Sequence, residues 1–198
     1  MSAITASDVK ALRDRTGAGM MACKNALAEA DGDMEKAVEL LRARGEAQAA
    51  KRAGNDATEG TIQSYIHNGR VGVLVEVDCE TDFVARNDAF VAFAKDLALH
   101  VAALAPLAVS DDDIPTEELE REKRIYVEQA AERPENVREK VVEGKINAWL
   151  NDVVLLRQKH VNEEKHEGKT IEEIRAKLAA DTGENVVIRR FARFEIGQ

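Results

Sequence analysis

Residues 61–79, TIQSYIHNGRVGVLVEVDC, carry the strongest indication of the fold in this sequence. Residues 61–67 predict a strand, and Asn68-Gly69 predicts a two-residue hairpin turn, because both central residues of such a turn need positive φ. Residues 70–79 form the return strand. One face of that strand carries Val71, Val73, Val75 and Val77. The stretch therefore predicts an antiparallel hairpin with an apolar face.

A second alternating stretch lies at the end of the sequence, in residues 186–196, and predicts a half-buried strand. The side chains predicted on one face are Val186, Ile188, Ala192, Phe194 and Ile196, and those on the other are Arg189, Arg193 and Glu195. A short apolar strand is also predicted at residues 153–156.

Runs of helix separate these strands. Helices are predicted at residues 90–104, at 117–132, from Pro134 onward, and around Ile171, Ile174 and Leu178 up to the turn at 181–183. Residues 159–169 are polar and are predicted to be mobile. Because no regular βαβ alternation is present, we expect an α+β core in which helices cover one face of a small antiparallel sheet.

The first third of the chain predicts three short helices. The second helix places Met20, Cys23, Leu27 and Ala30 on one face, and the third is expected to end at Gly45. Each apolar stripe is too narrow to be stable alone, so the three helices should pack as a bundle. Residues 46–59 predict an exposed helical linker. We therefore divide the chain into residues 1–54, bundle and linker helix, and residues 55–198, the α+β core.

Composition excludes several classes of protein. The 198 residues are 44% apolar and 33% charged, with a net charge of −9, which argues against a non-specific nucleic-acid binder. Cys23 and Cys79 are expected to be free thiols, as in a reducing compartment. The N-terminus does not resemble a signal peptide, and the longest apolar run, residues 97–109, is too short to span a bilayer. A cytoplasmic protein without membrane contact is expected.

Motifs of enzyme chemistry are missing from the sequence. The phosphate-loop pattern and the G-x-S-x-G elbow are absent, and Gly17-Ala18-Gly19 is followed by Ala22 where a dinucleotide fingerprint needs glycine. The four histidines have no metal-ligand spacing. We therefore expect no enzymatic activity, no cofactor and no metal site.

Residues 81–87, TDFVARN, stand out between a predicted strand and a predicted helix. They place an acidic side chain beside a large aromatic one in a loop. In one interpretation, Phe83 anchors the core and Asp82 caps the helix. In the other, the loop offers Phe83 to an apolar pocket of a partner and Asp82 to its polar or cationic groups, since exposed aromatic side chains commonly anchor interfaces.

Several motifs together resemble those of the elongation factor Ts family. They occur in the same order as in that family and extend over nearly the whole chain. The first is residues 12–27 with Thr16-Gly17-Ala18-Gly19-Met20-Met21 and Cys23-Lys24, and the second is residues 79–86, CETDFVAR. Residues 97–106, Val142-Glu143-Gly144 and the stretch from Gly183-Glu184-Asn185 to Glu195 agree as well. The length is similar to that of the short form of the family, which has one core module.

The resemblance implies a guanine-nucleotide exchange factor for elongation factor Tu. It implies a ubiquitin-associated type of N-terminal bundle that docks on the partner's nucleotide-binding domain, with contacts at Arg13, Met20 and Met21. Thr81, Asp82, Phe83 and Val84 would enter near the partner's magnesium site. Phe83 would wedge into an apolar pocket, and Asp82 would disturb the groups that hold the ion. His100 would contact another partner domain, or it is a semi-buried structural histidine.

The resemblance is incomplete at two places. Ala22 stands where the family usually has Asp, and Lys159-His160 stands where it often has Pro-Phe.

A second class of function, a ubiquitin-type or peptide-binding adaptor, would fit the N-terminal bundle alone. The short form also resembles family members that pair two copies, and a terminal edge strand must be covered or paired. We therefore expect a homodimer.

Overall fold

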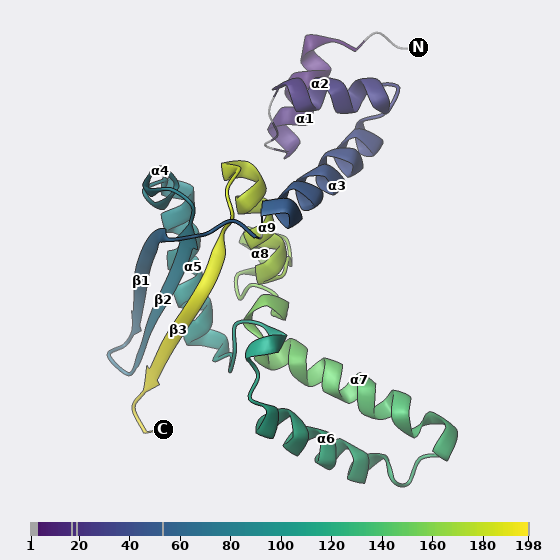
Figure 1. Cartoon of the computed structure of the whole chain (residues 1–198), viewed down its shortest axis with the longest axis vertical. Helices are drawn as coiled ribbons and strands as arrows, with labels where there is room; N and C mark the ends of the chain where they lie inside the picture. The colour runs from purple at the N-terminus through teal and green to yellow at the C-terminus, as the bar shows by residue number, and fades with distance from the viewer. Residues whose placement is uncertain (1–3, 17, 19, 53, 198) are drawn as a thin grey trace.

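A computed structural model describes residues 4–16, 18, 20–52 and 54–197. Within them the chain has the predicted α+β architecture: a helical bundle, then a small antiparallel sheet packed with helices (Figure 1). The helices are α1 (Ala6–Thr16), α2 (Met20–Glu29), α3 (Met34–Arg52), α4 (Asp82–Ala85), α5 (Asp88–Leu104), α6 (Thr116–Ala130), α7 (Glu135–Val153), α8 (Glu163–His166) and α9 (Ile171–Thr182). The strands are β1 (Glu59–His67), β2 (Val71–Cys79) and β3 (Val187–Glu195), and short 3₁₀ helices lie at Asp111–Asp113 and Leu155–Arg157.

The hairpin forms the first two strands of a sheet with the order β1-β2-β3. Asn68 and Gly69 have φ values of +50° and +67°, which confirms the predicted turn chemistry. The loop is one residue longer than predicted, because His67 pairs with Val71 and leaves Arg70 in the turn. The valine face of β2 is confirmed: Val73, Val75 and Val77 are buried in the main core.

A bulge in β3 overturns part of the predicted face assignment. Val77 pairs with Ile188 whereas Glu76 pairs with Arg190, so Arg189 is an extra residue on β3. Because side chains alternate along a strand, the insertion moves the later residues to the opposite faces. Ile188 is buried as predicted, but Phe194 and Ile196 are exposed on the outer face.

Helix α5 covers the inner face of the sheet and provides much of the core. The side chains that it buries are Phe90, Phe93, Ala94, Leu97, Ala98, His100 and Val101. Their spacing of three and four residues places them on one side of the helix, against β1 and β2. This packing fixes the start of α5, and therefore α4 immediately before it, relative to the sheet.

The N-terminal bundle has a core of its own. Val9, Leu12, Cys23, Ala26, Leu27, Ala30 and Ala37 form a separate cluster. The predicted helix end at Gly45 is wrong, since α3 continues to Arg52. Gly45 lies where α3 crosses α9: a Cβ built there would be 3.6 Å from the Ala180 Cβ. The predicted division between residues 54 and 55 falls in the connection between α3 and β1, and Gly17 and Gly19 of the predicted turn lie outside the described residues.

Helices α6 and α7 form an antiparallel hairpin that projects away from the sheet (Figure 1). Pro115 directly precedes α6, and Pro134 directly precedes α7 close to its predicted start. The strand predicted at residues 153–156 is reduced to one isolated parallel bridge between Val154 and Ala108, since Val153 ends α7 and a 3₁₀ helix starts at Leu155. Val154 and Leu155 are both buried, and periodicity cannot distinguish a short buried strand from a buried helix end.

Residues 159–169, predicted to be polar and mobile, instead pack against α5. His160 is buried, with its ring centroid 5.2 Å from that of His100 and 4.0 Å from that of His166. The Nδ1 atom of His160 accepts a hydrogen bond from the Asn162 amide at 3.0 Å. Lys165 pairs with Asp96 on α5. A polar stretch is thus held in place by its histidines.

This cluster should make folding sensitive to acid. Burial lowers the pKa of His160 from 6.5 to about 4, assisted by the charges of His166 and His100, while Asp96 acts in the opposite direction. The unfolded chain then binds more protons than the folded one between those two pH values. The free energy of unfolding should therefore fall as the pH drops from 6.5 toward 4.

Replacing His160→Gln should flatten this dependence, although burial also lowers the pKa of His100 and keeps part of the slope. Urea denaturation at several pH values between 7 and 4.5 measures the effect. The matched change His67→Gln, at an exposed histidine of the hairpin, is expected to leave the slope as it is. Equal slopes for the wild type and His160→Gln would contradict the assignment.

Candidate functional site

The segment between β2 and α5 folds into the four-residue helix α4. Thr81 caps its N-terminus: the Thr81 hydroxyl accepts a hydrogen bond from the Val84 amide at 3.4 Å. Asn87 then caps α5 by accepting from the Ala89 amide at 2.8 Å. The two caps in quick succession give the chain a sharp corner at the end of the sheet, and α4 occupies that corner.

Phe83 projects from this corner into solvent. Its side chain is 84% exposed, whereas Ala85 is buried and Val84 is packed in part against the main core. Asp82 and Arg86 form an ion pair at 3.0 Å on the surface of α4. The interpretation of Phe83 as a core anchor and Asp82 as the cap is therefore wrong, since Thr81 is the cap. We call residues 81–84 the probe segment.

Two carboxylates hold the base of the probe segment. Glu184 follows α9, and its Oε2 accepts from the amides of Glu80 at 3.1 Å and Thr81 at 3.0 Å. Its Oε1 accepts from the Thr81 hydroxyl at 2.6 Å. In return, Glu80 Oε1 accepts from the amide of Asn185 at 2.6 Å. The turn after β2 and the turn after α9 are thus linked reciprocally: the carboxylate of each accepts hydrogen bonds from backbone amides of the other.

The segment that follows α3 and leads from the bundle to the sheet also bonds to these two turns. Asn55 donates from its side chain to Glu80 Oε2 at 3.0 Å, and its carbonyl accepts from the Asn185 side chain at 3.0 Å. The hydrogen bond from the Asn185 amide lowers the pKa of Glu80 most, followed by that from the Asn55 side chain, and together they keep the Glu80 carboxyl group ionised. Burial raises the pKa of the Cys79 thiol to about 11, so this thiol stays protonated and donates to the Thr81 carbonyl at 3.2 Å.

The sequence marks Glu184 only as part of the family-like stretch from Gly183 to Glu195, without linking it to Thr81, and it gives no signal at Asn55. Glu184 lies 103 residues from Thr81 in the sequence, and the fold brings the three residues together: Leu178 and Ala179 of α9 lie in the main core, and α3 packs against α9. Gly183 makes the approach possible, since it ends α9 in the left-handed conformation with φ of +73°.

Arg13, Met20 and Met21 form a second exposed group, on α1 and α2 of the bundle. The two methionines lie at the start of α2 with much of their side chains in solvent. Figure 1 shows these two helices and α4 on different parts of the molecule, so the structure does not join this group and the probe segment into one site. A partner that touched both would have to reach across the molecule.

His100 is not on the surface of the described structure. It lies three turns beyond the start of α5, and it is fully buried. Its Nε2 donates to Gln158 Oε1 at 2.9 Å, and its Nδ1 accepts from the amide of Val161 at 3.1 Å, which fixes a neutral ring. The alternative of a structural histidine therefore describes it, and direct contact between its ring and a partner does not fit this conformation.

The site has the character of a binding surface. Within the described ranges, no group of three His, Cys, Asp or Glu side chains is placed to hold a metal ion. No helix in that part of the chain is both long and apolar enough to cross a membrane. What the geometry offers is an exposed aromatic ring and an ion pair on a corner that is braced from behind.

Comparison with known proteins assigns the family. A family model described as "Elongation factor TS" matches residues 9–167. The elongation factor Ts of Desulfotalea psychrophila is 54% identical over 197 residues, covering 98% of this chain and 99% of that protein. Those of Geobacter sulfurreducens and Syntrophus aciditrophicus are 51% and 52% identical, with 98% of this chain covered and 90% and 97% of theirs. The chain belongs to the elongation factor Ts family of translation elongation factors.

Proposed function

We propose that this chain is a guanine-nucleotide exchange factor that binds the GDP form of elongation factor Tu and promotes GDP release, so that GTP can bind. The observation that carries the proposal is the exposure of Phe83 on a braced corner. In this proposal Phe83 enters an apolar pocket of the partner, and Asp82 disturbs the groups that hold its magnesium ion. Arg13, Met20 and Met21 contact the nucleotide-binding domain.

Exchange of this kind needs differential binding and no covalent chemistry. The factor must bind the empty partner more tightly than the filled one, and the nucleotide then weakens the factor as much as the factor weakens the nucleotide. A loosening of about 10³-fold corresponds to roughly 4 kcal/mol. Burying an exposed phenylalanine contributes about 1.5–3 kcal/mol of binding. In this proposal the contribution counts toward the difference because the pocket for Phe83 opens together with the nucleotide site.

Release of labelled GDP from elongation factor Tu, timed with and without this chain, tests the proposal. Acceleration by amounts of this chain well below those of the partner is the expected result. A rate that does not change at saturating protein would end the exchange hypothesis and leave the adaptor alternative.

Truncating the ring separates the wedge from the rest of the interface. Phe83→Ala should lower the maximal rate of GDP release about tenfold or more, with a smaller loss of affinity, because the ring acts when the nucleotide site opens. Leu107→Ala removes another exposed apolar side chain, far from α4 in the sequence, and serves as the control. Stopped-flow kinetics over a range of protein concentrations give both quantities. Equal losses in the two variants would contradict the role of Phe83.

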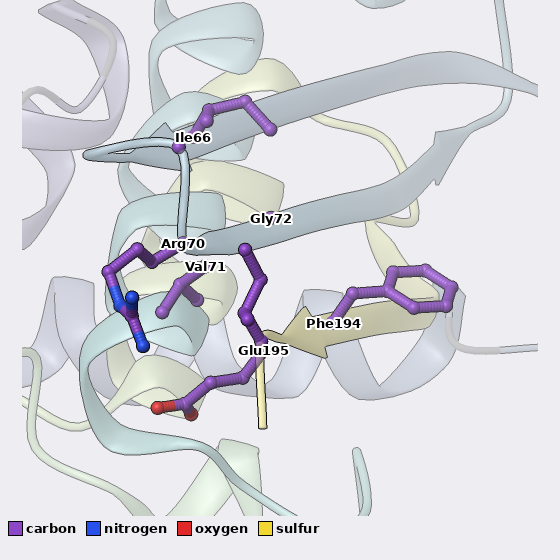
Figure 2. Close-up of a pocket in the computed structure, with 8 residues that line it drawn as sticks. Ile66, Arg70, Val71, Gly72, Phe194 and Glu195 are labelled. Carbon is purple, nitrogen blue, oxygen red and sulfur yellow. The ribbon is translucent and has the colours of Figure 1, made fainter. Parts of the chain in front are cut away.

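We further propose that two copies pair through the outer face of the sheet, opposite α5. The bulge places Phe194 and Ile196 on this face, where they join Ile62, Ile66 and Leu74, all five between 50% and 71% exposed. Ile66 and Phe194 lie on either side of Gly72 in one row across the strands. Because Gly72 has no side chain, a hollow of about 270 Å³ opens there, as Figure 2 shows.

Such an apolar face is unusual on a monomer and is typical of an interface. A second copy supplies a matching partner, since a two-fold axis through the sheet would place Phe194 and Ile196 of each copy against the same face of the other. Charges at the centre of the face are few: Leu74 is flanked by Ser64 on β1 and Ala192 on β3.

A lysine at the centre of the face should therefore break the pair. Leu74→Lys buries a charge if the dimer forms, so its mass in solution should fall to that of one chain. Light scattering over a range of concentrations measures this mass, and Ile125→Lys on α6 is the matched control at another exposed apolar position. A wild-type mass near that of one chain would refute the pairing.

A further inference from the structure

The probe segment is too short to hold its own shape. Helix α4 has four residues, and a single turn of helix is unstable in water without support from outside. Its internal bonds are few: the Ala85 amide donates to the Thr81 carbonyl at 3.1 Å and the Arg86 amide to the Asp82 carbonyl at 3.3 Å. The orientation of Phe83 must therefore be set from outside α4, by the packing of Val84 and Ala85 against the main core and by the bonds that hold Thr81.

Thr81 is held by Glu184. Three of the hydrogen bonds at this corner end on that one carboxylate, two from consecutive backbone amides and one from the Thr81 hydroxyl. Since the hydroxyl gives its proton to Glu184, its oxygen lone pairs remain free to accept from the Val84 amide and cap α4. Glu184 thus sets both the backbone at the start of α4 and the direction of its cap.

We infer that Glu184 is a positioning residue, which orients the probe segment so that Phe83 is presented to the partner. It does not touch the partner in this role; it acts through Thr81. Hydrogen bonds to a charged acceptor are stronger than those between neutral groups. A carboxylate is therefore well suited to keep the probe segment in place when Phe83 enters a pocket.

The brace also links the probe segment to the N-terminal bundle. Asn55, which follows α3, bonds to Glu80 through its side chain and to Asn185 through its carbonyl. Glu80 and Asn185 are the neighbours of Thr81 and Glu184 in the two turns. The position of the probe segment is therefore tied to the end of the helix that leads from the bundle.

The test compares Glu184→Ala with Glu173→Ala. Glu173 lies near the other end of α9, where its carboxylate accepts from the Thr170 amide at 2.9 Å and from the Thr170 hydroxyl at 3.3 Å. Its loss removes bonds of the same kind at the opposite end of α9, together with an ion pair to Arg42 at 3.6 Å, and leaves the bonds of the probe segment in place. If Glu184→Ala does not unfold cooperatively, Glu184→Gln replaces it, since the amide oxygen can still accept from the backbone while the amide nitrogen cannot accept from Thr81.

The first measurement needs no partner. Hydrogen exchange by NMR at the amides of Val84, Ala85 and Arg86 should become about tenfold faster or more in Glu184→Ala, and stay at the wild-type rate in Glu173→Ala. Unchanged exchange of these amides in Glu184→Ala would overturn the inference, whatever the protein does with elongation factor Tu.

The second measurement rests on the proposed function. Glu184→Ala should lower the maximal rate of GDP release from elongation factor Tu about tenfold, with affinity changed by about threefold or less. Adding Phe83→Ala to Glu184→Ala should cause little further loss, because the two residues act in one unit. Fully additive losses, or an unchanged rate despite a loosened α4, would overturn the positioning role. If the wild type itself fails to speed GDP release, the proposed function fails, and amide exchange still decides whether Glu184 braces α4.

Discussion

The carboxylate of Glu184 is the interaction on which the site depends. It accepts hydrogen bonds from two backbone amides and one hydroxyl at the corner between β2 and α4, and without it the amides of Glu80 and Thr81 lose their acceptor. An unpaired amide in a part-buried corner is costly, so the turn would rearrange. In the proposed exchange mechanism, the exposed ring of Phe83 can enter the partner's pocket only while that corner keeps its shape. The core of the protein thus supports a side chain that takes no part in the core.

The sheet serves the molecule on both of its faces. The inner face packs on α5 and fixes the start of that helix, which places α4 at the sheet end. Apolar side chains of β3 lie on the outer face because the bulge at Arg189 shifts the alternation of the residues that follow it. One inserted residue therefore separates two tasks: residues before it complete the core, and Phe194 and Ile196 after it face outward. The proposed exchange activity and the proposed pairing therefore both depend on the same three strands.

Much of the fold followed from local patterns. Asn68-Gly69, the valines of β2 and the apolar run at residues 90–104 are short-range signals, and they predict the hairpin and the helix that follows it. Features that depend on distant contacts did not follow: Gly45 continues α3 across α9, and Arg189 inserts a bulge that no alternation reveals. Residues 159–169 are polar in composition, but tertiary packing buries His160 and half-buries His166. At the site, Phe83 was identifiable by its place in a signature, whereas Glu184 needed the fold to bring it to Thr81.

The most direct test of the central claim measures the coupling between the two ligands of elongation factor Tu. Affinity of this chain for the partner is measured without nucleotide and with saturating GDP and magnesium, and affinity for GDP is measured with and without this chain. If this chain is an exchange factor, each ligand should weaken the binding of the other by the same factor, on the order of 10³. Equal affinity of this chain for the empty and the GDP-bound partner would contradict it.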